Sequence, residues 1–329
     1  MAPLPPALAP WLERRSSPEQ PLALTVGTMN FGARTPAPEA ERVVARALER
    51  GLRFFDTANL YGNGEAERIL GRALRGRRSE VGIASKVGLA RVAGRPEGLS
   101  GRQVVRAVDE VLQRLGTDFL DVLYLHAPDA RVPPEETLQA LHGLWKAGKV
   151  RHWGVSNFAA WRILELNLLS DSLGLPRPAI SQVLYNLLVR QLEVEYLEFT
   201  ARHPLHTTVY NPLAGGLLTG RYVPGAPAPQ GSRLASNRLY QRRYFSERLL
   251  ALAGELATVA REAGLSLLEL AYAWLASRPG VDSLVLGPGS VEHLDAALEA
   301  CARRLPEDVL RRVDDVHREY LGTDASYAR

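Results

Sequence analysis

The segment from Arg53 to Leu74 reads RFFDTANLYGNGEAERILGRAL and contains the unit from which the fold is built. It starts with Phe54 and Phe55 side by side, as in a β-strand that is buried on both faces. A glycine-rich loop follows, and then apolar residues recur at the spacing of an amphipathic helix. A strand that leads through a loop into a helix is the repeating unit of a parallel sheet.

The same alternation continues along the chain of 329 residues. Helical patterns such as EAERVVARALERG, GRQVVRAVDEVLQRLG and PEETLQALHGLWKAGK separate short apolar runs. The apolar runs are LALTVGTM, LRFFDTA, VGIASKVG, LDVLYLHAP, HWGVSNF, AISQVLYN, TTVYNPLAG and DSLVLGPG. Eight strand–helix units in a chain of this length predict a closed (β/α)8 barrel, the TIM barrel, as a single α/β domain.

A doubly wound open sheet is the competing architecture. Its dinucleotide-binding form requires the pattern G-x-G-x-x-G in the first turn from strand to helix. In this chain that turn reads GTMNFGARTPAPEA, which does not supply the pattern. The barrel is therefore the favoured prediction.

The domain organisation follows from the irregular stretches. Residues 1–20 are rich in proline and are expected to form a lead-in of little structure, and residues 21–329 are expected to form the barrel. The longest irregular stretch lies within a loop at about 218–245, and a loop of this length in a compact domain is usually functional. We expect this loop to be a lid or binding loop, and the C-terminal tail to lie over the active site.

Composition excludes several classes of protein. The net charge is +4, and acidic and basic residues alternate along the helical segments without a basic cluster, which excludes a nucleic-acid surface. The single cysteine, Cys301, allows no internal disulfide and favours a reducing compartment. The chain has no apolar run long enough to span a membrane and no basic segment ahead of an apolar one. We therefore expect a cytoplasmic protein, for which a homodimer is compatible with the sequence.

Polar and ionisable residues stand where the predicted strands end. In a barrel of parallel strands the carboxyl ends converge on one site, so these residues are expected to meet. They are Asp56 and, in the following loop, Tyr61; then Lys86, His126, Ser156, Asn157, Gln182, Tyr210 and Asn211. Lysine occurs only at positions 86, 146 and 149 among many arginines, which marks Lys86 as a residue with a specific task.

Four of these residues form a plausible chemical unit. The phenol of Tyr61 needs a nearby cation to lower its pKa before it can give up a proton at neutral pH, and Lys86 supplies that cation. Asp56 would keep Lys86 charged and oriented, and His126 would hydrogen-bond a carbonyl oxygen or relay a proton. Such a cluster protonates a carbonyl oxygen.

A reduction completes this chemistry only if a hydride reaches the carbonyl carbon. No side chain donates hydride, so a nicotinamide cofactor is implied. The cluster contains no nucleophile with an adjacent base. His126, His142 and His152 fit no zinc-binding pattern, so no metal is expected.

At this point the chain resembles the aldo-keto reductase superfamily. The segments that carry the resemblance, in the family's order and spacing, are DTANLYGNGEAERILG, IASKVG, LYLHAPD, GKVRHWGVSNF, SQVLYN and YNPLAGGLLTGRY. Within the superfamily it is most similar to the aflatoxin B1 aldehyde reductase and succinic semialdehyde reductase branch, through VGTMNFG, YNPLAGGLLTG, YQRRYF and the final SYAR.

The resemblance implies roles for particular residues. Tyr61 would be the general acid, assisted by Asp56, Lys86 and His126. A substrate carboxylate would be held by Arg243 and Arg329, with Met29 also in the substrate site. The cofactor, NADPH by family preference, would be bound by Ser156, Asn157, Gln182, Tyr210, Asn211, Leu213, Gly215, Leu217, Gly287, Gly289, Ser290 and His293.

The predicted function is therefore NADPH-dependent reduction of aldehydes to alcohols, with semialdehydes or dicarbonyls among the substrates and detoxification as the role. A different class of function also fits: a non-catalytic NADPH-binding regulatory subunit, like the potassium-channel β-subunits, which retain the same four residues. A sugar or sugar-nucleotide oxidoreductase on the same barrel is a third alternative.

Overall fold

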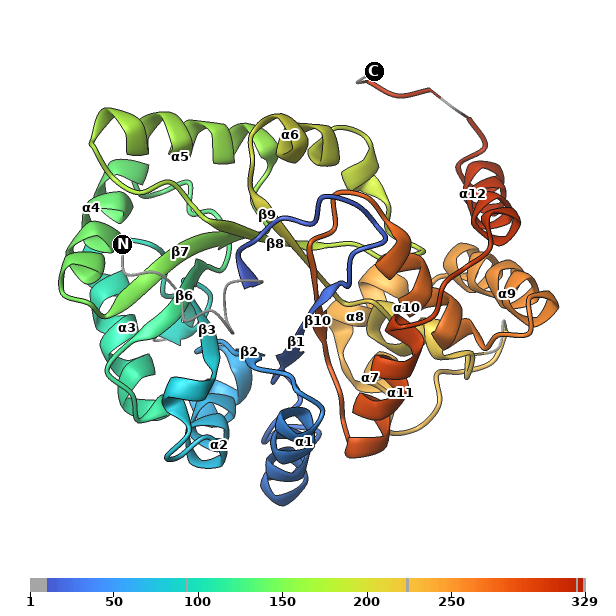
Figure 1. Ribbon diagram of the computed structural model, residues 1–329, viewed down its shortest axis with the longest axis horizontal. Coiled ribbons are helices and arrows are strands. Elements are labelled where there is room, and N and C mark those ends of the chain that lie inside the picture. The colour runs from blue at the N-terminus through green and yellow to red at the C-terminus, as the bar shows by residue number, and fades with distance from the viewer. Residues whose placement is uncertain (1–10, 93, 223–224, 324, 328–329) are drawn as a thin grey trace.

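The chain forms a closed barrel of parallel strands surrounded by helices (Figure 1). The computed structural model describes residues 11–92, 94–222, 225–323 and 325–327. Within this part of the chain the barrel strands are β1 (Ala23–Gly27), β2 (Phe54–Asp56), β3 (Gly82–Val87), β6 (Leu120–Leu125), β7 (Val150–Ser156), β8 (Ile180–Leu184), β9 (His206–Tyr210) and β10 (Ser283–Leu286). Each strand pairs with the next barrel strand along the chain, and β10 pairs with β1. The prediction of a single (β/α)8 domain is confirmed.

Helices and short ribbons connect the strands. The helices are α1 (Ala37–Glu49), α2 (Glu65–Ala73), α3 (Gly101–Leu115), α4 (Pro134–Lys146), α5 (Ala160–Ser172), α6 (Tyr196–Arg202), α7 (Arg233–Ser236), α8 (Arg238–Tyr244), α9 (Glu247–Glu262), α10 (Leu267–Ser277), α11 (Val291–Cys301) and α12 (Glu307–Leu321). Short 3₁₀ turns are η2 (Tyr61–Gly64), η3 (Arg78–Glu80), η4 (Gln191–Glu193) and η5 (Ala214–Thr219), and a two-stranded ribbon is formed by β4 (Arg91–Val92) and β5 (Arg95–Pro96).

The continuous apolar runs of the sequence arise because both faces of the barrel strands are covered. Along β3, Ile83 and Val87 belong to the core between barrel and helices, whereas Ala84 belongs to the smaller core inside the barrel. This alternation is the two-residue period of a strand. The next inward position after Ala84 is Lys86, which is 1% exposed. Strand periodicity therefore aims Lys86 into the barrel.

The N-terminal residues that the structure describes close the end of the barrel at which the strands begin. Trp11 is 1% exposed and stacks on Phe54 with ring centroids 5.0 Å apart. Its ring lies over Gly82, where a Cβ atom would come within 2.5 Å of it. Residues 1–20 were expected to have little structure, and of these residues 1–10 lie outside the described part of the chain. Trp11 fills the opening of the barrel, and Arg15 donates to the Val281 carbonyl at 2.9 Å, so these two residues are attached to the barrel.

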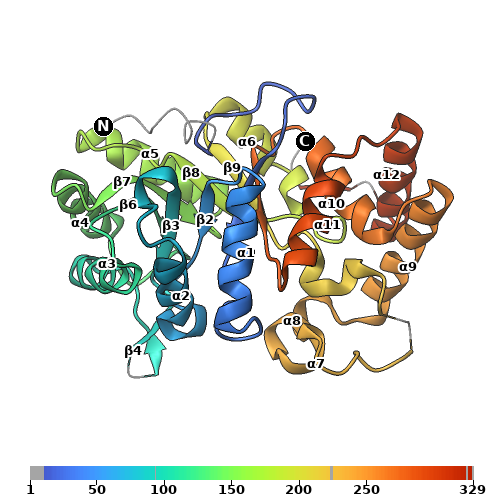
Figure 2. The ribbon, with the colours of Figure 1, turned by 60° about the horizontal axis from the view of Figure 1, so that its bottom comes forward.

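The long loop and the tail lie in different places. The loop contains α7 and α8, which lie along the lower side of the molecule in Figure 2, the side on which β4 also lies. The described residues of the tail, 322–323 and 325–327, extend outward from α12 and not over α7 and α8 (Figures 1 and 2). Tyr327 is 84% exposed. The described part of the tail therefore lies away from α7 and α8, and the expectation that the tail lies over the active site stays a prediction.

Replacing Trp11 with alanine is expected to lower the free energy of unfolding by about 3 to 5 kcal/mol, because a buried aromatic ring is lost and a cavity remains. Urea denaturation measures the change. The matched control is Trp161→Ala, since Trp161 is 59% exposed and its loss is expected to cost less than about 1 kcal/mol. Equal effects of the two substitutions would contradict the role of Trp11.

Candidate active site

Inward-facing positions of neighbouring strands bring the predicted residues together at the carboxyl ends. Asp56 ends β2, Lys86 lies near the end of β3 and His126 follows β6. On the next strands, Ser156 pairs in register with Gln182. All five are buried. The polar residues that the sequence placed at strand ends therefore form one cluster at the mouth of the barrel.

The ammonium group of Lys86 is the centre of this cluster. It donates hydrogen bonds to the Asp56 carboxylate, to the Thr57 carbonyl at 3.0 Å and to the Tyr61 hydroxyl at 3.3 Å. An ammonium group has three N–H donors, so all are used. Burial lowers the pKa of Lys86, but Asp56 and Tyr61 raise it, and the net pKa lies above its ordinary value. Lys86 is therefore charged and fixed in position.

Asp56 has both carboxylate oxygens engaged. One oxygen accepts from Lys86, and the other accepts from the side-chain amide of Gln182 at 2.8 Å. The resemblance gave Gln182 a role in binding the nicotinamide carboxamide. In the structure its NH₂ group holds Asp56, so this residue also orients the carboxylate that orients Lys86.

Tyr61 is presented by the glycine-rich loop that follows β2. Gly62, Asn63 and Gly64 all have positive φ angles of 56°, 53° and 86°, and left-handed backbone of this kind favours glycine and asparagine. A Cβ at Gly64 would lie 2.5 Å from the side chain of Arg114. The loop composition is thus required to turn the chain so tightly that Tyr61 reaches Lys86.

The phenol of Tyr61 holds its proton more firmly than the sequence suggested. Burial raises its pKa, and the charge of Lys86 lowers it by less, so the net pKa lies above the ordinary value. Lys86 does lower the pKa of the phenol, as the sequence predicted, but the sequence did not reveal the larger, opposite effect of burial. At neutral pH Tyr61 therefore carries the proton that a general acid must deliver.

His126 stands beside Tyr61 as a neutral ring. The two rings meet edge to face, with centroids 6.1 Å apart. Burial and the charge of Lys86 lower the pKa of His126 to about 3. Its Nδ1 atom is buried without a hydrogen-bond partner among the residues that the structure describes. A neutral imidazole fits the role of hydrogen-bonding a carbonyl oxygen, and not that of a proton source.

Asn157 connects the opposite side of the mouth. Its backbone has a φ of 63°, and its side-chain amide donates to the His126 carbonyl at 2.9 Å and to the Ser156 hydroxyl at 3.0 Å. The Tyr210 hydroxyl donates to its amide oxygen at 2.7 Å. The structure therefore brings together Ser156, Asn157 and Tyr210, three residues assigned to the nicotinamide by resemblance.

The loop after β9 forms a compact turn around Asn211. The Asn211 side chain accepts from the Gly215 N–H at 2.8 Å and donates to the Tyr244 hydroxyl at 2.7 Å. Gly215 has a positive φ of 70°, and Leu217 is 1% exposed, while Leu213 is partly buried against the core. The predicted cofactor segment is thus held to α8 in the long loop.

The loop after β10 is attached to the loop after β1. Asn30 donates to the Gly287 carbonyl at 3.1 Å, and Thr35 donates to the Gly289 carbonyl at 3.1 Å. Ser290 is the N-cap of α11, and its hydroxyl accepts from the His293 N–H at 3.3 Å. These predicted cofactor residues lie apart from the catalytic cluster, on the neighbouring segment of the rim.

Glu39 is a residue near this loop that the sequence did not reveal. Its carboxylate accepts from the Val291 N–H at 3.1 Å, in the first turn of α11. It also forms an ion pair with Arg42. A negative charge at this helix start opposes the binding of a phosphate there.

The sequence analysis also missed three arginines beside these loops, Arg34, Arg221 and Arg233. Arg34 donates to the Gly231 carbonyl at 2.9 Å, and Arg233 donates to the side chain of Asn30. Burial lowers the pKa of Arg34, and the charges of Arg233 and Arg221 lower it further. None of the three forms an ion pair with an acidic side chain among the described residues. A signal was present, since the sequence has no Asp or Glu between Glu198 and Glu247.

The predicted substrate residues are placed only in part. Met29 follows β1 and is 39% exposed. Arg243 is exposed in α8 and lies near the Tyr210 phenol, whose pKa is raised by burial and lowered in part by the Arg243 charge. Arg329 lies outside the described residues, so the predicted pairing of the two arginines is not observed.

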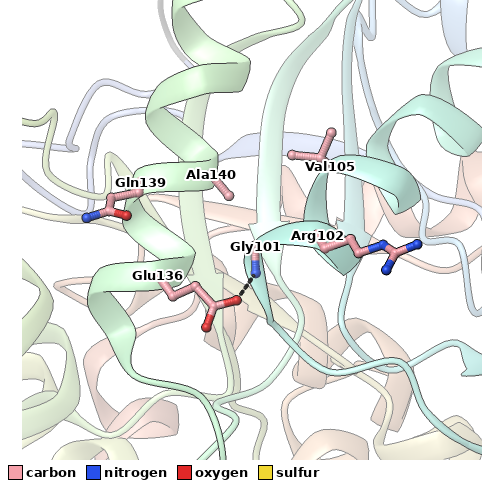
Figure 3. Close-up of a pocket in the computed structure, with 6 residues that line it drawn as sticks. All are labelled: Gly101, Arg102, Val105, Glu136, Gln139 and Ala140. Carbon is pink, nitrogen blue, oxygen red and sulfur yellow. Dashed lines mark hydrogen bonds between the residues drawn. The ribbon is translucent and has the colours of Figure 1, made fainter.

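Other surfaces of the described chain offer little for chemistry. No cluster of three or more His, Cys, Asp or Glu side chains that could hold a metal occurs in it. None of its helices is long and apolar enough to cross a membrane. A hollow between α3 and α4 is shown in Figure 3, but its carboxylate, Glu136, already accepts from the Gly101 N–H at 2.7 Å.

The fold and the cluster define an oxidoreductase built on a (β/α)8 barrel. The Aldo/keto reductase family model matches residues 23–318, so the chain belongs to the aldo/keto reductase family, which reduces carbonyl groups with NAD(P)H.

Relatives carry two kinds of name. The chain is 36% identical over 290 residues to a probable voltage-gated potassium channel subunit beta of Arabidopsis thaliana, covering 84% of this chain and 88% of that protein. A protein of the same name from Oryza sativa subsp. japonica is 35% identical over 264 residues, covering 79% and 80%. The solved structure of a glycerol dehydrogenase from Gluconobacter oxydans aligns with a TM-score of 0.76 and 25% identity, covering 94% and 96%.

The neutral state of His126 predicts a flat pH profile. Since its pKa is about 3, and the pKa values of Lys86 and Tyr61 are raised, kcat/KM for an uncharged aldehyde is expected to change less than about twofold between about pH 5 and pH 8. The rate should fall only at alkaline pH, where Tyr61 loses its proton. His126→Asn should keep this shape. An acid limb near the ordinary pKa of histidine that disappears in His126→Asn would contradict the assignment.

Proposed function

We propose that this protein reduces aldehydes to alcohols with NADPH, with Tyr61 as the proton donor. The observation that carries the proposal is the hydrogen bond from Lys86 to the Tyr61 hydroxyl, within a buried group completed by Asp56. This contact leaves the Tyr61 proton free to be donated, because the phenol oxygen accepts from Lys86 and its O–H has no described acceptor.

Each residue of the cluster has a defined task. A bound reduced nicotinamide supplies the hydride for the carbonyl carbon. Tyr61 gives its proton to the carbonyl oxygen, so that an alcohol and a phenolate result. Lys86 stabilises the phenolate by its fixed charge, and Asp56 keeps that charge in place. His126, as a neutral donor, orients the carbonyl oxygen.

The residues present fit a phosphate-bearing cofactor. Arg34, Arg221 and Arg233 supply positive charge without acidic partners among the described residues, and arginine suits phosphate. The loop that starts at Asn211 and the loop that precedes Ser290 would hold the other parts of the cofactor. We infer NADPH over NADH from this charge, and Glu39 at the start of α11 acts against it.

The substrate class is an aldehyde, with semialdehydes and dicarbonyls included. Resemblance to the aflatoxin aldehyde reductase branch supports a detoxifying role, and the exposed Arg243 would attract a substrate carboxylate together with Arg329. Assembly as a homodimer is part of the same proposal.

A second candidate function is a non-catalytic NADPH-binding subunit of a channel. The observation that favours it is the similarity to two plant proteins that are named probable voltage-gated potassium channel subunits beta. The two functions share the same cofactor site, so cofactor binding alone does not separate them, whereas turnover of an aldehyde does.

The test is NADPH oxidation, followed by absorbance, with 4-nitrobenzaldehyde and succinic semialdehyde as parallel substrates. Turnover of both, with a lower KM for the acid, supports the reductase and its arginine site. Turnover of only the neutral aldehyde removes the carboxylate role. Tight NADPH binding without turnover of either aldehyde contradicts the reductase and supports the subunit.

Tyr61→Phe is expected to lower kcat by about a hundredfold to ten-thousandfold, the range for loss of a positioned general acid. The Kd for NADPH, measured by quenching of protein fluorescence, should stay within about twofold of the wild-type value, because the phenol is not assigned to cofactor binding. A variant with unchanged kcat would show that another group donates the proton.

Glu39→Gln is expected to raise the ratio of NADPH affinity to NADH affinity by about three- to tenfold. The substitution removes the negative charge that lies against the first turn of α11, and it frees Arg42 from its ion pair. The amide oxygen can still accept from Val291. Titration with each cofactor measures the ratio. Glu41→Gln, an exposed change on the same helix, is the control, and the same shift in both variants would contradict a specific effect at Glu39.

A further inference from the structure

Tyr240 is brought over the mouth of the barrel by the long loop. It lies in α8, whose first turn is capped by the Asn237 side chain, and only 5% of it is exposed. Its ring covers Gly215, where a Cβ would come within 2.6 Å of the ring. The guanidinium of Arg233, a residue of α7, lies 4.8 Å from the centroid of the Tyr240 ring. These contacts fix the position of the ring.

The hydroxyl group of Tyr240 has only a weak partner. It donates to the sulfur of Met29 at 3.7 Å, and a thioether is a weak acceptor. A buried O–H without a good acceptor costs free energy. By contrast, the neighbouring Tyr244 hydroxyl accepts a hydrogen bond from Asn211 at 2.7 Å. A ligand oxygen would therefore be a better partner for Tyr240 than the one it has.

The hydroxyl of Tyr240 lies on the rim of the same barrel mouth. Met29, which it contacts, follows β1 at the carboxyl end, where Asp56 ends the paired strand. Burial is the main cause of the raised pKa values of Tyr61 and Tyr210, and the electrostatic interaction with Tyr240 acts in the same direction on both. Tyr240 is thus within electrostatic range of both tyrosines.

We propose that Tyr240 is a substrate-positioning residue, whose hydroxyl donates a hydrogen bond to a second oxygen on the aldehyde close to the carbonyl that Tyr61 protonates. The preferred substrates are then aldehydes with a hydroxyl or carbonyl oxygen on the neighbouring carbon. This inference rests on the proposed reductase function and deepens it by naming the substrate class. The hydrogen bond replaces the weak contact with Met29.

The experiment compares Tyr240→Phe with the wild-type protein on propanal and 2-hydroxypropanal, which differ only by the second oxygen. The phenylalanine ring keeps the packing on Gly215 and Arg233. The KM for 2-hydroxypropanal is expected to rise about five- to tenfold, as for loss of one uncharged hydrogen bond. The KM for propanal, both kcat values and the Kd for NADPH should change less than about twofold. Tyr272→Phe, a buried tyrosine of α10, is the matched control and should change none of these values.

Each other result has a distinct meaning. Equal changes in both KM values, or no change in either, would overturn the role of the hydroxyl in substrate positioning. A weaker Kd for NADPH with an unchanged KM ratio would place Tyr240 in the cofactor site and also overturn it. Absence of turnover by the wild-type protein on both aldehydes, with NADPH bound, would contradict the proposed function itself, on which the inference rests.

Discussion

The structure depends on one buried charge, the ammonium group of Lys86. A cation that is 1% exposed is stable only if its donors are satisfied and a counter-charge is close. Asp56 supplies the counter-charge, the Thr57 carbonyl and the Tyr61 hydroxyl take the other two donors, and Gln182 holds the far oxygen of Asp56. Three strands and one glycine-rich turn are therefore constrained by the same group. Removing the side chain of any one of these partners would leave a buried polar group unpaired, at a cost in free energy.

The two ends of the barrel are built differently, and this difference creates the site. The end at which the strands begin is filled by Trp11 and the small core around Phe54. The end at which the strands finish carries the polar side chains of the site and is bordered by loops. Asn30 joins three of these loops, because its side chain accepts from Arg233 and donates to the Gly287 carbonyl. A cofactor and substrate thus meet a closed floor and a rim whose segments are fixed to one another.

The sequence predicted the fold because strand and helix periods alternate clearly, and it predicted Asp56, Tyr61, Lys86 and His126 because ionisable residues at strand ends of a barrel must converge. Other features depend on distances that no local pattern carries. Trp11 is one aromatic residue near a proline-rich segment, and nothing in the sequence shows that the barrel opening receives it. The net pKa shift of Tyr61 depends on how far burial outweighs one nearby charge, which the sequence does not contain. Arg34 lies within electrostatic range of Arg233 only because separate loops fold together. The stretch without acidic residues before Glu247 was the one sign of this in the sequence.

In the proposed reaction, the fixed charge of Lys86 allows Tyr61 to donate its proton. The most direct measurement is the single-turnover rate of NADPH oxidation with 4-nitrobenzaldehyde in Lys86→Met, beside the Kd for NADPH of the same variant. The rate is expected to be lower by about a thousandfold or more, as for loss of electrostatic stabilisation at the reacting group, with a Kd within about twofold of the wild-type value. A wild-type rate with unchanged cofactor binding would contradict it.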